Sequence, residues 1–320
     1  MGGGISSLSK ICVVGASERR DVDIDFTFVQ VGVKDDRIDY AGNCGNMSSA
    51  IGPFAVDSGL IRGITGSETT VSLYNTNTKK IIHATFPVVP GGEEAVYDGD
   101  FAIDGVAGTG AKIQLDFIDP SGSKTGKLLP TGNVVDRIEG LDVTCIDAGN
   151  PCVFVKADDL AVDGALLPEE TERRGDLLAR LESLRATAAV AMGMAPTVDE
   201  VPPSIPKICF VSTPTSHALV SGERLAGDSV DVVVRAISTG QPHKALPITS
   251  SLCVSAAAQL DGSVVQQCLG RPTGPKTELV VGHPSGRLVV GAVYDAAGQL
   301  RSSTVFRTAR RLMEGRVYWK

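Results

Sequence analysis

The sequence lacks the long apolar runs and leader features that place a chain in or across a membrane. Its longest apolar stretch, Ala186–Ala195, is about half of the roughly 20 residues that a membrane-spanning helix needs. At the amino end, Met1 is followed by glycines and serines, without the basic start or apolar core of a secretory signal. We therefore predict no membrane partner and no export, and expect a cytoplasmic protein.

The sequence also lacks spaced cysteine and histidine pairs. Its seven cysteines are odd in number, scattered, and never in a C-x-x-C pair, so neither a disulfide framework nor a zinc knuckle is indicated. The four histidines are not spaced as ligand pairs either, and we predict no metal site. The cysteines are Cys12, Cys44, Cys145, Cys152, Cys209, Cys253 and Cys268, and the histidines are His83, His217, His243 and His283.

An excess of basic charge is missing as well. The 30 Lys and Arg residues are outnumbered by 37 Asp and Glu residues, and no long basic run occurs, which argues against nucleic acid as a partner. There is no G-x-S-x-G elbow, no G-x-x-x-x-G-K-[ST] loop, no H-E-x-x-H, and no G-x-G-x-x-G opening a helix after a strand. Hydrolase, nucleotide-binding and zinc-protease functions lose support, and no cofactor is expected.

What is present is a turn-rich globular composition. The 320 residues, with 42% hydrophobic residues, 36 Gly and 17 Pro, suffice for about two domains. Short strands alternate with turns, and two segments rich in small residues, 45–56 and 247–258, are each predicted as an enclosed helix. Leucines at helical spacing predict a further helix over 168–195.

This pattern predicts an α+β protein made of two similar lobes, each with strands around one helix, and a cleft between them. The repeat of strands, small-residue helix and strands suggests an internal duplication. Two unrelated α+β domains would give the same pattern, and the sequence pattern does not separate these alternatives.

Cys44 lies between two glycines, in the motif Gly42-Asn43-Cys44-Gly45-Asn46, where a strand-rich segment gives way to a predicted helix. The free N–H groups and the dipole of a helix start favour negative charge, on a thiol held there or on a bound carboxylate. A buried cysteine in a Gly-Asn turn is the structural alternative.

Lysines and histidines in several loops could form an anion-binding rim in this acidic chain. Lys10 ends the Gly/Ser-rich opening just before a strand, where it is either a surface residue or a proton-exchanging group in a water-poor cleft. Ordinary turn chemistry would account for the other loops, and a lone histidine such as His283 is more often a turn or core residue. The rim residues are Lys124, Lys127, His243 and Lys244.

Several long motifs resemble those of the PrpF-like isomerases, from the first residues to the last. That family includes isomerases of aconitate and methylaconitate, methylitaconate isomerases and oxalomesaconate tautomerases. The resemblance implies the diaminopimelate epimerase-like fold, two pseudo-symmetric lobes each wrapped around a central helix. The matching motifs are residues 1–10, 39–46 (Asp-Tyr-Ala-Gly-Asn-Cys-Gly-Asn), 127–133 (Lys-Leu-Leu-Pro-Thr-Gly-Asn), 149–151 (Gly-Asn-Pro) and 307–315 (Arg-Thr-Ala-Arg-Arg-Leu-Met-Glu-Gly).

The resemblance implies that Lys10 and Cys44 are the acid and base. Diaminopimelate epimerases use one cysteine from each lobe, but here the second helix starts without a thiol and Cys253 would lie inside it. Further groups are expected to bind a small polycarboxylate substrate. They are Ser9, Asn43, Gly45, Asn46, Lys127, Thr131, Asn150, His243, Lys244, Thr249, Ser250, His283 and Ser285.

We therefore expect a cofactor-independent isomerase that moves a double bond, or changes its cis/trans geometry, in a small unsaturated di- or tricarboxylic acid. The expected lobes are residues 1–138, completed by about 303–320, and residues 139–302. The resemblance also implies an amino-terminal segment that this sequence does not contain. This difference favours, as the alternative, a catalytically inactive carboxylate-binding protein. Nucleophilic catalysis by a cysteine would need a histidine partner, and the sequence shows no such Cys/His pair. The sequence leaves open whether the protein forms a homodimer.

Overall fold

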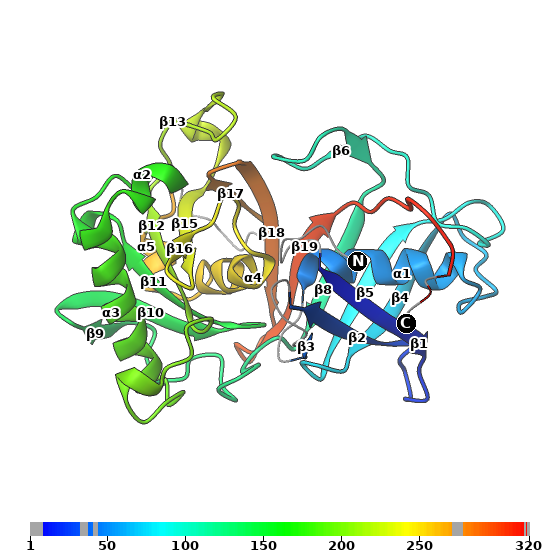
Figure 1. Ribbon diagram of the computed structural model, residues 1–320, viewed down its shortest axis with the longest axis horizontal. Helices are drawn as coiled ribbons and strands as arrows, with labels where there is room; N and C mark the ends of the chain where they lie inside the picture. Colours follow the sequence, from blue (N-terminus) through cyan, green and yellow to red (C-terminus); the bar gives the residue numbers. More distant parts are fainter. Residues whose placement is uncertain (1–8, 33–37, 41–43, 271–277, 317, 319–320) are drawn as a thin grey trace. The chain divides into compact units, whose positions relative to one another are not determined.

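The computed structural model describes residues 9–32, 38–40, 44–270, 278–316 and 318, so the predicted site residue Asn43 lies outside the described residues. The chain forms two compact units: Met1–Leu115 with Phe306–Lys320, and Asp116–Val305. It passes from one unit to the other within strands β8 and β19 (Figure 1). The lobe boundaries expected from the sequence stay a prediction.

The first unit is a mixed sheet with strand order β1-β2-β4-β5-β8, and β3 pairs with β2. Strands β1 and β2 are antiparallel, β2 and β4 are parallel, and β4 and β5 form an antiparallel hairpin. The short strands β6 and β7 pair separately. The strands are β1 (Lys10–Ala16), β2 (Ile24–Val31), β3 (Ile38–Asp39), β4 (Glu68–Asn75), β5 (Lys80–Pro87), β6 (Phe101–Ala102), β7 (Thr109–Gly110) and β8 (Ile113–Ile118).

Helix α1 (Gly45–Asp57) connects β2 and β3 to β4 and packs against β1, β4 and β5 (Figure 1). Its small residues permit this close packing. A Cβ atom at Gly52 would come within 2.6 Å of the Phe86 ring, so glycine is required there for contact with β5. Asn46, Ala50 and Phe54 form an exposed stripe along the other side of the helix.

The second unit has strand order β19-β18-β17-β15-β12-β11-β10-β9, with β16 paired to β15 and a separate β13-β14 pair. Strand bounds are β9 (Asp136–Ile138), β10 (Leu141–Asp147), β11 (Pro151–Lys156), β12 (Lys207–Ser212), β13 (His217–Ala218), β14 (Arg224–Leu225), β15 (Val232–Ser238), β16 (Gln241–Pro242), β17 (Glu278–His283), β18 (Gly286–Tyr294) and β19 (Leu300–Arg307). Helices are α2 (Pro168–Glu172), α3 (Gly175–Ala191), α4 (Ile248–Ala257) and α5 (Val264–Gln267), with 3-10 turns at Asp158–Leu160, Val198–Glu200 and Gly227–Ser229.

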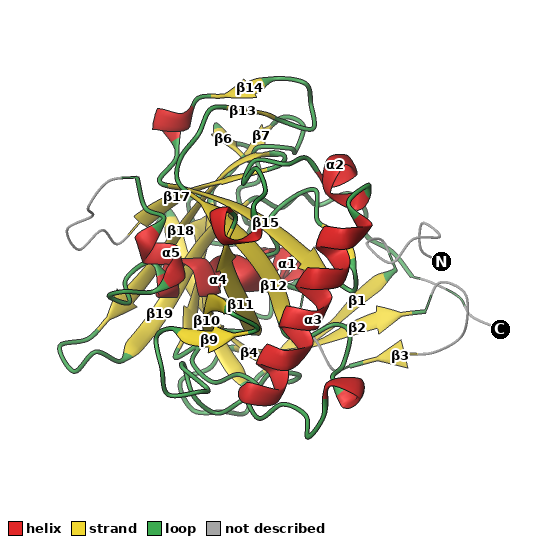
Figure 2. Cartoon of the chain, turned by 90° about the vertical axis from the view of Figure 1, so that its left-hand side faces the viewer, coloured by secondary structure: helices red, strands yellow, loops and turns green. Residues whose placement is uncertain are grey.

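The helix predicted over residues 168–195 is in fact two helices. Arg174, between α2 and α3, has a ψ of 72°, which is outside the helical region. Helix α3 ends at Ala191, and Gly193 then adopts a φ of 72°. Helix α3 packs against β9 and β12 (Figure 2). The leucines that carried the helical spacing all lie in α3, and Leu177, Leu181 and Leu184 are buried in the core of the second unit.

The two units repeat one arrangement. In the first, an antiparallel pair (β1, β2) is followed by α1 and then a parallel neighbour, β4, that forms a hairpin with β5. In the second, the antiparallel pair β12 and β15 is followed by α4, the parallel neighbour β17, and its hairpin partner β18. The α+β class with mixed sheets is confirmed, and each unit holds one small-residue helix as predicted.

Within the described part of the chain, no helix combines the length and apolarity needed to cross a membrane.

Candidate active site

Lys10 and Cys44 meet in the first unit although 34 residues separate them in the sequence. The Nζ atom of Lys10, the first residue of β1, lies 3.6 Å from the Sγ atom of Cys44. Cys44 is the N-cap residue of α1, with extended backbone angles, and its carbonyl accepts hydrogen bonds from the N–H groups of Met47 and Ser48. Both side chains are half-buried. An amine and a thiol are therefore in direct contact at the positive end of a helix.

Cys12 is a neighbour of this pair that the sequence analysis did not single out. It is half-buried, two residues after Lys10 on β1, and therefore on the same face of the strand. Burial raises the pKa of the Cys12 thiol to about 11, and the electrostatic interaction with the Cys44 thiol adds to the shift. Cys12 stays a neutral thiol at physiological pH. The spacing of two residues between Lys10 and Cys12, at the point where the predicted strand begins, was the signal that could have found it.

Three further predicted residues of the first unit stand next to the pair in the chain. Ser9 is buried, and its carbonyl accepts hydrogen bonds from the Val31 N–H group at 2.9 Å and the Gln30 side chain at 3.0 Å, which fixes the chain entering β1. Gly45 and Asn46 are the first two residues of α1. Their N–H groups have no acceptor within the helix, as at every helix start, and are suited to binding an anion.

Arg307, at the end of β19, is a second residue that the sequence analysis left without a role. It is only 9% exposed, and its Nε atom donates a hydrogen bond to Oδ1 of Asn46 at 3.1 Å. Its guanidinium therefore lies beside the first turn of α1. The motif Arg307–Gly315 was noted as part of the family resemblance, but its position in space could not be read from the sequence.

In the second unit, the start of α4 holds Thr249 and Ser250, with Pro247 as the N-cap residue. Ser250 is buried and Thr249 is half-buried. Cys253 lies inside the helix, as predicted, and its thiol donates to the carbonyl of Asn150 at 3.0 Å. Burial raises the pKa of Cys253, so this thiol is structural and not available for proton transfer at neutral pH.

Four other predicted residues come together at β17, β18 and the loop after β16. The Ser285 hydroxyl donates to the Lys244 carbonyl at 2.6 Å, and the Ser285 N–H group donates to Nδ1 of His283 at 3.1 Å. His283 is buried, whereas the Lys244 side chain is exposed. Burial lowers the pKa of His243, and the positive charge of Lys207 lowers it further. His243 is therefore neutral at physiological pH.

The loop with Lys127 and Thr131 is organised by a buried carboxylate. Asp147 accepts hydrogen bonds from the hydroxyl of Ser123, the N–H group of Lys124, and both the N–H and hydroxyl groups of Thr125. Thr131 donates its hydroxyl to Asp136 at 2.7 Å, and the Lys127 side chain is exposed. Lys127 therefore projects from a fixed loop.

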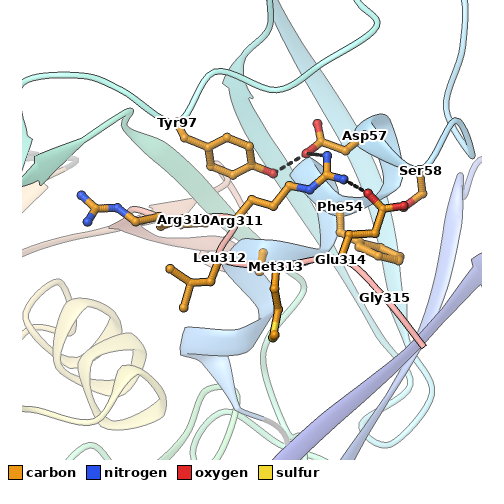
Figure 3. Close-up of a pocket in the computed structure, with 12 residues that line it drawn as sticks. Phe54, Asp57, Ser58, Tyr97, Arg310, Arg311, Leu312, Met313, Glu314 and Gly315 are labelled. Carbon is orange, nitrogen blue, oxygen red and sulfur yellow. Dashed lines mark hydrogen bonds and ion pairs between the residues drawn. The ribbon is translucent and has the colours of Figure 1, made fainter. Parts of the chain in front are cut away.

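A cavity of about 750 Å³ lies in the first unit at the opposite end of α1 from Cys44 (Figure 3). It is lined by Phe54, Tyr97 and the segment 309–315, and contains no predicted site residue. Asp57, in the last turn of α1, accepts hydrogen bonds from the Tyr97 hydroxyl at 2.7 Å and from Arg311 at 3.4 Å. The end of β19 and the segment that follows it therefore contact α1 at both ends, through Arg307 and Asn46 at the start and through Arg311 and Asp57 in the last turn.

Among the described residues, no group of three or more His, Cys, Asp or Glu side chains is arranged to hold a metal ion. What the first unit offers instead is an amine, a thiol and a helix start together. These features define a class of α+β proteins in which a small-residue helix begins beside an amine and a thiol in contact.

The comparisons identify the family. The model of the family described as "PrpF protein" matches residues 1–320, and the chain belongs to the PrpF family. It is 41% identical to the 3-methylitaconate isomerase of Eubacterium barkeri, over 97% of this chain and 82% of that protein. It is 36% identical to the 2-methyl-aconitate isomerase of Shewanella oneidensis, over 99% of this chain and 83% of that protein.

A solved structure has the same fold. A crystal structure of methylitaconate-delta-isomerase superimposes with a TM-score of 0.90 at 40% sequence identity, covering 98% of this chain and 82% of that one. The family resemblance stated from the motifs is confirmed. The roles of the individual site residues are not tested by these comparisons and stay predictions.

Proposed function

We propose that this protein is a cofactor-independent isomerase of a small unsaturated di- or tricarboxylic acid such as methylitaconate, methylaconitate or aconitate. The observation that carries the proposal is the 3.6 Å contact between Lys10 Nζ and Cys44 Sγ at the start of α1. The substrate class is supported by the names of the two relatives, which are isomerases of 3-methylitaconate and 2-methyl-aconitate.

The reaction needs only proton transfer. One group removes a proton from the carbon next to the carboxylate-bearing double bond, and an acid returns a proton at the far end of the allylic system, so the double bond moves by one carbon. Lys10 and Cys44 supply these two roles in one order or the other. The C–H bond that breaks and the C–H bond that forms balance, and no oxidant or reductant is consumed.

The intermediate carbanion spreads its charge onto carboxylate oxygens. The N–H groups of Gly45 and Asn46 at the start of α1 stabilise this charge, together with the helix dipole. General acid–base groups contribute about 10² to 10⁴ in rate, so binding of the carboxylates must supply much of the remaining acceleration.

Residues of the second unit that the sequence analysis assigned to substrate binding remain part of this proposal. The start of α4 resembles that of α1 in being rich in small hydroxyl residues, with Thr249 and Ser250 in its first turn. His243, Lys244, His283 and Ser285 are close to one another in the chain's fold. A neutral His243 and a cationic Lys244 would offer a donor and a charge to a carboxylate.

The test is incubation with cis-aconitate, methylaconitate and methylitaconate in deuterated buffer, followed by proton NMR. We expect one acid to convert, with new vinyl or methyl resonances and deuterium at the exchanged carbon. Loss of turnover in Cys44→Ser and in Lys10→Ala, with the fold intact, would support the assigned roles. If none of the acids converts but aconitate raises the melting temperature, the protein binds carboxylates without catalysis and the isomerase proposal is wrong.

A further inference from the structure

Three arginines are strongly buried among the residues that the structure describes, and Arg307 differs from the other two. Arg235 donates to the carbonyls of Leu166, Ala165 and Val234. The guanidinium of Arg185 pairs with Glu182 and donates to backbone carbonyls as well. These two arginines are therefore well supplied with acceptors, as expected for buried cations.

Arg307 has far fewer acceptors. Its Nε donates to Asn46 Oδ1 at 3.1 Å and its Nη1 donates to the carbonyl of Phe306 at 2.7 Å. A guanidinium carries five N–H donors, so about three remain without an acceptor among the described residues. No carboxylate of the described residues forms an ion pair with it, and burial alone lowers the pKa of Arg307 to about 10. It is still a cation at physiological pH.

The surroundings of this cation are themselves positive. Asn46 is the second residue of α1, so the guanidinium lies at the positive end of the dipole of a 13-residue helix. Lys10 contacts Cys44, the N-cap residue of the same helix. A buried cation without a counterion among the described residues, beside a helix start, is stabilised when an anion binds there.

We propose that Arg307 binds a carboxylate of the substrate at the start of α1, and that Asn46 is the positioning residue for its guanidinium. The planar fork of an arginine fits a carboxylate with two parallel hydrogen bonds, and the donors left over by Asn46 and Phe306 suffice for this. The amide of Asn46 orients the guanidinium of Arg307 without neutralising it. An aspartate at position 46 would form an ion pair with the guanidinium and compete with the carboxylate of the substrate. This inference rests on the proposed function and names the group that selects an acid.

The experiment measures binding and turnover separately. Isothermal titration with tricarballylate, a saturated tricarboxylate that cannot isomerise, gives the affinity, and the substrate found by NMR gives KM and kcat. The variants are Arg307→Gln, Arg307→Lys and Asn46→Asp. Arg310→Gln is the matched control, since it removes one exposed positive charge from the same segment.

Loss of a charge-assisted, bidentate contact weakens binding on the order of tenfold to a hundredfold. We expect this loss in Arg307→Gln and Asn46→Asp, a smaller loss in Arg307→Lys, and none in Arg310→Gln. KM should change more than kcat. A purely structural role would lower the melting temperature and leave the affinity of the folded fraction unchanged.

One outcome would overturn the role of Arg307, and another would overturn the proposed isomerase function. If the wild-type protein converts an acid while Arg307→Gln and Asn46→Asp keep its KM and its tricarballylate affinity, this inference is wrong and the proposed function stands. If the wild-type protein converts none of the acids, the proposed function fails. Binding of tricarballylate that depends on Arg307 would then still support the carboxylate contact. Should Arg307→Gln not fold, Arg307→Lys and Asn46→Asp decide the question.

Discussion

The Nζ atom of Lys10 and the Sγ atom of Cys44 lie 3.6 Å apart, although one side chain comes from a strand and the other from the N-cap of a helix. The two residues are 34 positions apart in the sequence, so the fold and not chain proximity brings them together. The contact depends on the packing of α1 against β1, so the small residues of α1 are part of what makes the site.

Replacement of either member of this pair should reduce turnover strongly. In Cys44→Ser and Lys10→Ala we expect a decrease of about 10² to 10⁴ in kcat, because a general acid or base is lost. Circular dichroism and the melting temperature should stay close to those of the wild type. The NMR assay measures the rates, and wild-type rates in both variants would refute the assignment.

Cys12 should resist alkylation over the neutral range. Its pKa of about 11 leaves on the order of one thiolate in a thousand at pH 8, and only thiolates react. The rate of labelling by iodoacetamide at Cys12, followed by peptide mass spectrometry, should rise about tenfold per pH unit up to about pH 11. A plateau below pH 9 would contradict the prediction.

The raised pKa of Cys12 also makes the free energy of unfolding depend on pH. The pKa of Cys12 is raised above its ordinary value of 9.0, so folding favours the protonated thiol. Its contribution is fully present below about pH 9 and is lost as the pH rises towards 11. In Cys12→Ala, urea unfolding between pH 9 and pH 11 should show a shallower fall of the free energy of unfolding than in the wild type.

Gly52→Ala should destabilise the first unit. The added Cβ atom would lie 2.6 Å from the Phe86 ring and 3.2 Å from the Cβ atom of Ala84, so helix and sheet must separate or the ring must turn. Overpacking of this kind costs about 1–3 kcal/mol. Gly15→Ala is the control, because a Cβ atom there has nothing within 4 Å. Equal melting temperatures for the two variants would show that α1 and β5 accommodate the added Cβ atom at position 52, and would contradict the prediction.

Asp147→Asn should loosen the loop that carries Lys127. The carboxylate of Asp147 is completely buried and accepts hydrogen bonds from Ser123, Lys124 and Thr125, whereas an amide presents a donor to one of these groups. We expect a loss of about 1–3 kcal/mol in the free energy of unfolding. Asp142→Asn, which removes an exposed pairing with Arg137, should cost less than about 1 kcal/mol. Urea titration distinguishes the two.

The sequence was sufficient to predict the helix at 45–56 and its partner at 247–258, because their small residues and flanking strands are local features. It was also sufficient for the family, because the motifs are long. The helix over 168–195 was predicted as one piece since leucine spacing does not reveal a break at Arg174. The position of Arg307 could not be predicted, because its contact with Asn46 joins residues 261 apart in the sequence.

The N-cap residue of α4, Pro247, bears on the stereochemistry of the proposed reaction. Pro247 occupies the place that Cys44 holds on α1, and a proline offers neither a thiol nor an N–H group. A catalyst that inverts a carbon centre needs a donor on one side of the planar intermediate and an acceptor on the other. In the mechanism proposed here, Lys10 and Cys44 act from the same unit, so the proton lost from one carbon and the proton gained by the other should leave and arrive on the same face of the planar intermediate.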